Sequence, residues 1–214
     1  MHNRRIGSAV VSAIGLGGMP LSIEGRPDEE RAVATIHAAL DAGITFIDTA
    51  MSYCLNSSET GHNESLIARA LAAYGADTSE VLVGTKGGAA READGAWSFN
   101  GDPATLREAC EGSLKRLGVD ALGLYQLHVP DPNVPYADSG ISRAGGLGSS
   151  YAAFARIAEE REVSPQKVCL AWELAKSPVV VPISGSSRPA TIRDSAAAAD
   201  LKLTDAEFAE LDAT

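Results

Sequence analysis

Short apolar runs alternate with amphipathic segments along most of this chain, and this alternation restricts the fold more than any other feature. Runs that predict buried strands lie at residues 11–18, 45–50, 81–88 and 122–130. Segments with apolar side chains at helical spacing lie between them, at residues 28–43, 63–75 and 102–118. One strand with its helix recurs about every 30 residues, which is the length of a βαβ crossover. The alternation predicts a parallel sheet covered by helices.

Polar residues mark the starts of several predicted helices. Asp102 precedes Pro103, so we expect Asp102 to be the N-cap and Pro103 the first helical residue. Ser164 is followed by a proline in the same way, and Asn63 is the expected N-cap of the second predicted helix. Each of these side chains has an oxygen that can accept a hydrogen bond from the free N–H groups of a first helical turn.

The alternation changes after the fourth strand. Residues 131–150 are rich in Gly, Ser and Pro, which predicts a loop or linker. The elements expected after this linker are helices at 151–162 and 164–177, a strand at 179–185, and helices at 188–200 and 204–213. Too little chain remains to close an eight-stranded barrel. We therefore expect one α/β domain over residues 1–214, an incomplete TIM-type (β/α) barrel of about five parallel strands with surrounding helices.

Composition excludes several classes of function. Hydrophobic residues make up 45% of the chain and charged residues 21%, which is ordinary for a globular protein. The net charge of -10 argues against general binding of nucleic acid or of anionic membranes. No apolar run reaches the length of a membrane span, and the first residues do not form a secretory signal. The three cysteines have neither disulfide nor zinc spacing, so we expect no metal site and a cytoplasmic location.

Four polar residues follow or end three of the predicted strands: Asp48, Tyr53, Lys86 and His128. Barrels of alternating strands and helices place their reactive groups at these strand ends. A carboxylate, a phenol, an amine and an imidazole brought together there can transfer protons. Each of these residues on its own is more often packed and hydrogen-bonded than catalytic. Trp97, in the loop after the third strand, is either a wall of the substrate pocket or a side chain packed on the barrel rim.

Longer segments give this chain a specific resemblance. They are GLGGMPLS, AGITFIDTAMSYCLNSSETGHNESLIARAL, VLVGTKGG, LGLYQLHVPDPNVP and the stretch from SPQKVCLAWELAK to the C-terminus. Together these segments resemble the aldo-keto reductases, a (β/α)8 family of NADPH-dependent carbonyl reductases, over nearly the whole chain. The family's fifth, sixth and seventh strands with their helices have no counterpart. At about 30 residues per unit, roughly 90 residues are absent.

The resemblance implies a role for each of the four polar residues. Tyr53 would be the general acid that protonates the carbonyl oxygen of a small substrate. Lys86 would lower the pKa of Tyr53, and Asp48 would pair with Lys86 and orient it. His128 would orient or polarise the carbonyl group and share in proton transfer.

The resemblance also implies where NADPH binds. Ser186, Ser187 and Arg188 would hold the 2′-phosphate after the last strand, where a helix N-terminus offers free N–H groups. The alternative is that these residues form only a polar loop. The residues that bind the carboxamide and stack on the nicotinamide in the family belong to the missing strands.

Five strands cannot close at the tilt and stagger of an eight-stranded barrel. The fourth and last strands would be open edges, and such edges are normally covered or paired. The two successive helices over residues 151–177 could cover the opening. We otherwise expect a homodimer or another protein chain there.

Three functions remain open on the sequence alone. The first is an NADPH-dependent reductase of a small carbonyl compound. The second is a cofactor-independent acid–base enzyme that uses the same four residues for dehydration, isomerisation or cyclisation. The third is a non-catalytic protein in which these residues are a relic.

Overall fold

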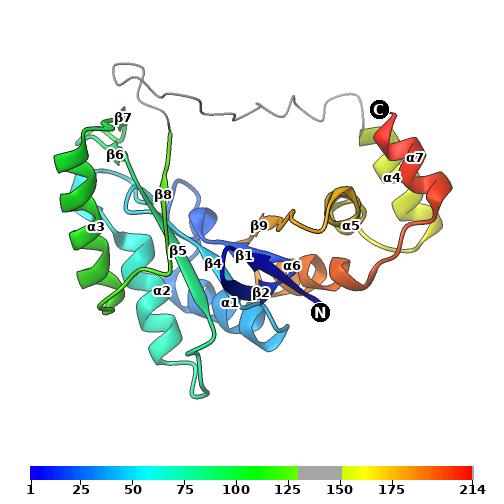
Figure 1. The fold of residues 1–214 in the computed structure, drawn as a ribbon, viewed down its shortest axis with the longest axis horizontal. Coiled ribbons are helices and arrows are strands. Elements are labelled where there is room, and N and C mark those ends of the chain that lie inside the picture. Colours follow the sequence, from blue (N-terminus) through cyan, green and yellow to red (C-terminus); the bar gives the residue numbers. More distant parts are fainter. Residues whose placement is uncertain (130–150, 214) are drawn as a thin grey trace.

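The computed structural model describes residues 1–129 and 151–213, so the predicted linker at 131–150 lies outside the described residues. Parallel strands form a central five-stranded sheet in the order β8-β5-β4-β3-β9 (Figure 1). In chain order these strands are β3 (Gly15–Gly17), β4 (Phe46–Asp48), β5 (Leu82–Gly87), β8 (Leu124–Leu127) and β9 (Ile183–Gly185). The predicted α/β fold with five parallel strands is therefore confirmed.

Helices cover the outer side of the sheet and continue beyond β9 (Figure 1). They are α1 (Glu29–Asp41), α2 (His62–Ala72), α3 (Pro103–Leu117), α4 (Tyr151–Glu160), α5 (Pro165–Lys176), α6 (Pro189–Ala196) and α7 (Asp205–Asp212). Helix α1 contacts both α2 and α6, and α2 contacts α3. Among the residues that the structure describes, no helix is long and apolar enough to cross a membrane.

The predicted helix starts are partly confirmed. Asp102 caps α3 by accepting from the N–H groups of the first turn, and Ser164 caps α5 in the same way. The N-cap predicted at Asn63 is wrong, because α2 begins at His62 and Gly61 occupies the cap with a φ of 80°. Asn63 instead lies buried inside the first turn, where its side chain bonds to neighbouring elements.

Two antiparallel hairpins were not expected from the sequence. The predicted first strand over residues 11–18 is divided between β2 (Ala9–Ser12), which pairs with β1 (Asn3–Ile6), and β3. The second hairpin joins β6 (Ala89–Arg91) to β7 (Trp97–Phe99) in the loop after β5. The segments are only three or four residues long, too short to show a period.

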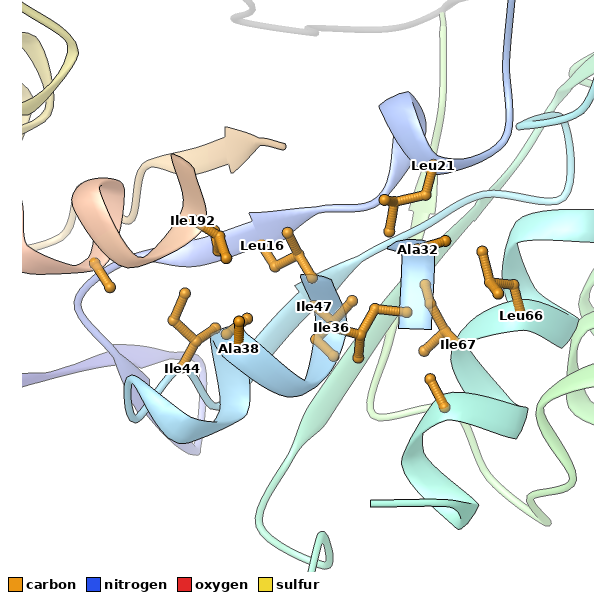
Figure 2. Close-up of a cluster of buried hydrophobic side chains, with 13 residues drawn as sticks. Leu16, Leu21, Ala32, Ile36, Ala38, Ile44, Ile47, Leu66, Ile67 and Ile192 are labelled. Atoms are coloured by element: carbon orange, nitrogen blue, oxygen red, sulfur yellow. The ribbon is translucent and has the colours of Figure 1, made fainter. Parts of the chain in front are cut away.

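The main hydrophobic core lies between the sheet and helices α1, α2 and α6 (Figure 2). Leu16 of β3 and Ile47 of β4 are fully buried against side chains that include Ile36 of α1 and Ile192 of α6. Because side chains alternate along a strand, Phe46 and Asp48 lie on the face opposite to Ile47. The helices thus leave the inner face of the sheet free for polar residues.

Phe46 fills this inner face next to Asp48, and glycines on both neighbouring strands make room for it. A Cβ on Gly15 would lie 2.8 Å from Cδ1 of Phe46, and one on Gly84 would lie 3.1 Å from its Cε2. Phe46 is only 1% exposed. The aromatic ring therefore fills the space on the inner face of the sheet below the carboxyl ends of the strands.

The sheet is open, as the missing units predict. Among the described residues, β8 pairs only with β5 and β9 only with β3. The helices over residues 151–177 do not cover this opening. Helix α5 packs against Ala13, Ile14 and the turn over Ala197–Asp200, and α4 and α7 lie beyond α5, away from β8 (Figure 1). Ile183 on β9 is left 41% exposed.

Replacing Ile47 by alanine tests the placement of this core. Ile47 is fully buried between the sheet and the helices, so the substitution should lower the free energy of unfolding by about 2–5 kcal/mol. Val10→Ala is the matched control, because Val10 is 52% exposed on β2 and its truncation should change stability by about 0.5 kcal/mol or less. Urea unfolding measures both. Equal losses for the two variants would contradict this core.

Candidate active site

The four polar residues identified in the sequence come together at one end of the sheet. Asp48 is the last residue of β4, and Lys86 lies one residue before the end of β5. His128 follows β8 directly, and its backbone N–H donates to the carbonyl of Gly87 over 2.9 Å. Tyr53 lies in the loop after β4. Because β4, β5 and β8 are parallel neighbours, their carboxyl ends carry these side chains to one place.

The Lys86 ammonium joins three parts of this site. Its Nζ donates to Oδ2 of Asp48 over 2.5 Å, to the carbonyl of Thr49 over 2.9 Å and to the Tyr53 hydroxyl over 2.9 Å. An ammonium group has three N–H donors, so all of them are used. Burial raises the pKa of Asp48 and lowers the pKa of Lys86, and the charge of each partner opposes the shift of the other.

The Tyr53 phenol keeps its proton at neutral pH. Burial raises its pKa above the ordinary value, and the Asp48 carboxylate raises it further. The net shift of this pKa is therefore upward, opposite to the lowering expected from Lys86, because the phenolate would be buried close to the Asp48 carboxylate. Lys86 donates to the phenol oxygen, so the phenol must donate its own hydrogen elsewhere. No acceptor among the described residues takes that hydrogen.

The His128 ring lies against Tyr53 on one side. The two ring centroids are 5.5 Å apart, with an angle of 81° between the planes. Burial, together with the Lys86 charge, lowers the pKa of His128 to about 4, so the imidazole is neutral at pH 7. Nδ1 of His128 lies 3.2 Å from the hydroxyl of Ser52. The sequence analysis missed Ser52, because no spacing pattern links two residues that are 76 positions apart.

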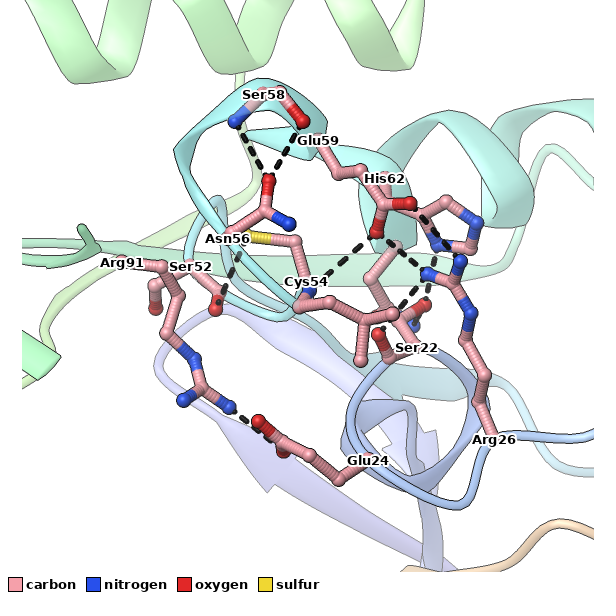
Figure 3. Close-up of polar contacts among 12 residues, drawn as sticks. Ser22, Glu24, Arg26, Ser52, Cys54, Asn56, Ser58, Glu59, His62 and Arg91 are labelled. Carbon is pink, nitrogen blue, oxygen red and sulfur yellow. Dashed lines mark hydrogen bonds and ion pairs between the residues drawn. The ribbon is translucent and has the colours of Figure 1, made fainter. Parts of the chain in front are cut away.

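The loop between β4 and α2, which carries Ser52 and Tyr53, is held by polar contacts (Figure 3). Arg26 donates to both carboxylate oxygens of Glu59, over 2.7 and 3.0 Å. Glu59 also accepts a longer hydrogen bond from the backbone N–H of Leu55, at 3.4 Å. A bidentate pair of this kind fixes both position and orientation. The loop is thus held in place without a ligand.

Trp97 also lies beside His128, with its ring centroid 6.2 Å from that of the imidazole. Its indole is stacked on the guanidinium of Arg91, 4.0 Å from the centroid. Arg91 in turn pairs with Glu24 over 2.9 Å (Figure 3). Trp97 is therefore close to the reactive groups and also packed on a neighbouring side chain, with 40% of its surface exposed, so both interpretations of this residue agree with the structure. Arg91 is a second residue that the sequence analysis missed.

The predicted phosphate ligands follow β9. They therefore lie at the carboxyl ends of the parallel strands, as the four polar residues do. The buried hydroxyl of Ser186 donates to the carbonyl of Arg188 over 3.0 Å, so Ser186 shapes the turn. Arg188 is the N-cap of α6, but its side chain does not cap the helix. Within the described residues, the side chains of Ser187 and Arg188 form no hydrogen bond or ion pair with other protein groups.

The three cysteines, Cys54, Cys110 and Cys169, are free thiols. In the part of the chain that the structure describes, no group of three or more His, Cys, Asp or Glu side chains is arranged to hold a metal ion.

Comparison with known proteins agrees with this geometry. The family model described as "Aldo/keto reductase family" matches residues 13–141 and 148–214. An uncharacterized oxidoreductase of Schizosaccharomyces pombe is 26% identical over 278 aligned positions, covering 97% of this chain and 88% of that protein. The alignment has 278 positions but the chain has only 214 residues, so at least 64 positions of the alignment are gaps in this chain. Gaps of this size are expected if internal strand–helix units are missing.

Solved structures show the same fold. The glycerol dehydrogenase of Gluconobacter oxydans superposes with a TM-score of 0.77 at 21% identity, covering 99% of this chain and 94% of that one. An aldo-keto reductase from Klebsiella pneumoniae, crystallised in complex with NADPH, gives 0.73 at 20% identity over 100% and 95% of the two chains. With a family match over most of its length, this chain belongs to the aldo/keto reductase family of oxidoreductases.

Proposed function

We propose that this protein reduces a small carbonyl compound with NADPH as the hydride donor. The observation that carries the proposal is the hydrogen-bond direction at Tyr53. Lys86 occupies the phenol oxygen as a donor, so the phenol hydrogen is left for a ligand beside His128. A buried phenol that remains protonated and has no protein acceptor within the described residues is suited to donate to a carbonyl oxygen.

Each of the four polar residues has a separate role in one proton transfer. Tyr53 donates its proton to the carbonyl oxygen as that oxygen gains negative charge. The Lys86 ammonium, 2.9 Å away, stabilises the phenolate that remains. Asp48 keeps the ammonium charged and oriented through their ion pair. Neutral His128 offers a second hydrogen bond to the same carbonyl, and Trp97 bounds the site beside it.

The residues present fit NADPH at two points. The Arg188 side chain is exposed at a helix N-terminus and is paired with no carboxylate of the described residues, which suits a phosphate. Ser186 and Ser187 stand in the same turn. Oδ1 of Asp48 is buried and finds no partner within the described chain, so it can accept from a hydroxyl of the bound molecule. NADPH, when bound, supplies the hydride that reduces the carbonyl carbon.

A second function is favoured by the opening between β8 and β9. The strands that seat the nicotinamide in the family would lie there, and the described residues put no strand in that place. The four polar residues could then act by proton transfer alone, in dehydration, isomerisation or cyclisation of a carbonyl compound. This reaction needs Tyr53 and His128 but no hydride.

Titration of the protein with NADPH in a calorimeter, followed by an assay of NADPH oxidation with a panel of aldehydes and ketones, tests the first function. We expect binding, oxidation of NADPH, and loss of oxidation by at least about 100-fold in Tyr53→Phe, because a general acid contributes that much. Tyr74→Phe is the matched control, since the Tyr74 hydroxyl donates to Asp41 at the surface.

The other outcomes identify the alternatives. No binding of NADPH would reject the reductase. Turnover of a carbonyl compound without NADPH, lost in Tyr53→Phe, would establish the cofactor-independent enzyme. Absence of both activities would leave a non-catalytic protein.

Arg188→Ala tests the proposed phosphate site. A hydrogen bond to a charged group contributes about 1.5–3 kcal/mol, so the Kd for NADPH should rise by roughly 10- to 150-fold. The Kd for NADH, which lacks the 2′-phosphate, should stay within about twofold if this Arg contacts only that phosphate. Arg193→Ala, at the other end of α6, is the control. An equal rise in the Kd for NADPH and for NADH would show that Arg188 does not contact the 2′-phosphate.

We further propose that a second copy of the chain covers the open edges β8 and β9, because Val179, Ile183 and Leu127 leave apolar surface beside unpaired strand groups. Sedimentation should show a dimer, and Ile183→Lys should convert it to a monomer. Val10→Lys, at a more exposed position on the N-terminal hairpin, should leave the dimer intact. A wild-type monomer that binds no apolar dye would contradict this proposal.

A further inference from the structure

The residue immediately before Tyr53 reaches the other reactive ring of the site. The Ser52 hydroxyl lies 3.2 Å from Nδ1 of His128. Ser52 is only 1% exposed, and it belongs to the loop that the Arg26–Glu59 pair holds in place (Figure 3). The contact is therefore built into the fold and does not depend on a bound molecule.

The direction of this hydrogen bond follows from what surrounds the hydroxyl. A neutral imidazole carries one N–H donor and one acceptor nitrogen. If Nδ1 carried the hydrogen, Ser52 would accept it, and its own buried O–H would need another acceptor. No described residue supplies one, and a buried donor without a partner is costly. If instead the Ser52 hydroxyl donates to Nδ1, both groups are satisfied and the imidazole hydrogen lies on Nε2.

The contact also selects the orientation of the ring. Tyr53 and Trp97 both meet the imidazole nearly edge to face, with interplanar angles of 81° and 85°. These two contacts fix the plane of the ring, but a half-turn about the Cβ–Cγ bond would keep that plane and exchange Nδ1 with a carbon. Only a polar partner on one side distinguishes the two orientations, and within the described residues Ser52 is that partner.

We propose that Ser52 is a positioning residue, which holds His128 as the Nε2–H tautomer in a single orientation so that Nε2 can donate to a substrate oxygen. The role of Ser52 in catalysis rests on the proposed function. The assignment of the His128 tautomer does not depend on that function. The Tyr53 hydroxyl and His128 Nε2 would then act as two donors toward one carbonyl oxygen. Because Ser52 and Tyr53 are consecutive, the loop that positions the Tyr53 phenol also orients the His128 imidazole.

Nitrogen-15 NMR of the His128 imidazole tests the tautomer directly in the wild-type protein at pH 7. Long-range correlations between the ring nitrogens and carbon-bound hydrogens distinguish Nε2–H from Nδ1–H, so we expect Nε2–H. In Ser52→Ala we expect a mixture of tautomers. The pKa of His128 should also move up toward its ordinary value, because a hydrogen bond that favours the neutral ring is lost. Nδ1–H in the wild type, or an unchanged tautomer and pKa in the variant, would overturn the proposal.

Kinetics give the second measurement. Loss of one neutral hydrogen bond corresponds to a fall of about 3- to 10-fold in kcat for carbonyl reduction, and the Kd for NADPH should not change. Ser58→Ala is the matched control, because it makes the same chemical change in the same loop at an exposed position whose hydroxyl donates to Asn56. Unfolding curves show whether Ser52→Ala folds.

The two hypotheses fail in different ways. If the wild-type protein neither binds nor oxidises NADPH, the proposed function fails, while the NMR experiment still decides the role of Ser52. If NADPH is oxidised but the tautomer does not respond to Ser52→Ala, only the present inference is overturned.

Discussion

The site depends on the Lys86 ammonium and the three hydrogen bonds that it donates. A charge buried this far is costly unless its partners are in place, and removing one partner of such a pair typically costs about 3–5 kcal/mol. Here the partners come from the last residue of β4, from the next residue, and from the loop that carries Tyr53. The ion pair with Asp48 therefore joins two strands, and the third hydrogen bond sets the direction in which the Tyr53 phenol must donate.

Buried polar contacts from α2 support the strand ends beside this ammonium. Asn63 accepts from the Thr49 hydroxyl over 2.6 Å and donates to the carbonyl of Gly18 over 2.8 Å. Glu64, also fully buried, accepts from the Thr85 hydroxyl over 2.6 Å and pairs with Arg116 over 2.6 Å. Thr49 and Thr85 each stand next to a residue of the site in the sequence. One helical turn thus holds both strands, which explains why polar residues occupy its inner face.

The sequence was sufficient for the five parallel strands, for the helices and for the place where the reactive residues meet, but not for the two short hairpins. Parallel strands end at one edge, so polar residues at Asp48, Lys86 and His128 had to be near one another. The direction of the Tyr53 pKa could not be predicted, because it depends on how deeply the phenol is buried and how closely Asp48 balances Lys86. The role of Asn63 was missed for a similar reason. Its residue type favours a cap, but three buried partners from other segments placed it inside the helix.

The order of the strands explains how the site can persist in a chain that lacks part of the barrel. The reactive side chains come from β4, β5 and β8, which are consecutive in the sheet, and the proposed phosphate turn follows β9 beyond β3. A deletion between β8 and β9 removes none of these contacts. It opens the sheet along the free edges of β8 and β9, and leaves the pairing of β8 with β5 and of β9 with β3 in place. The proposed proton transfer and the proposed phosphate site are therefore separable in this fold, because the first uses residues after three adjacent strands and the second uses only the turn after β9.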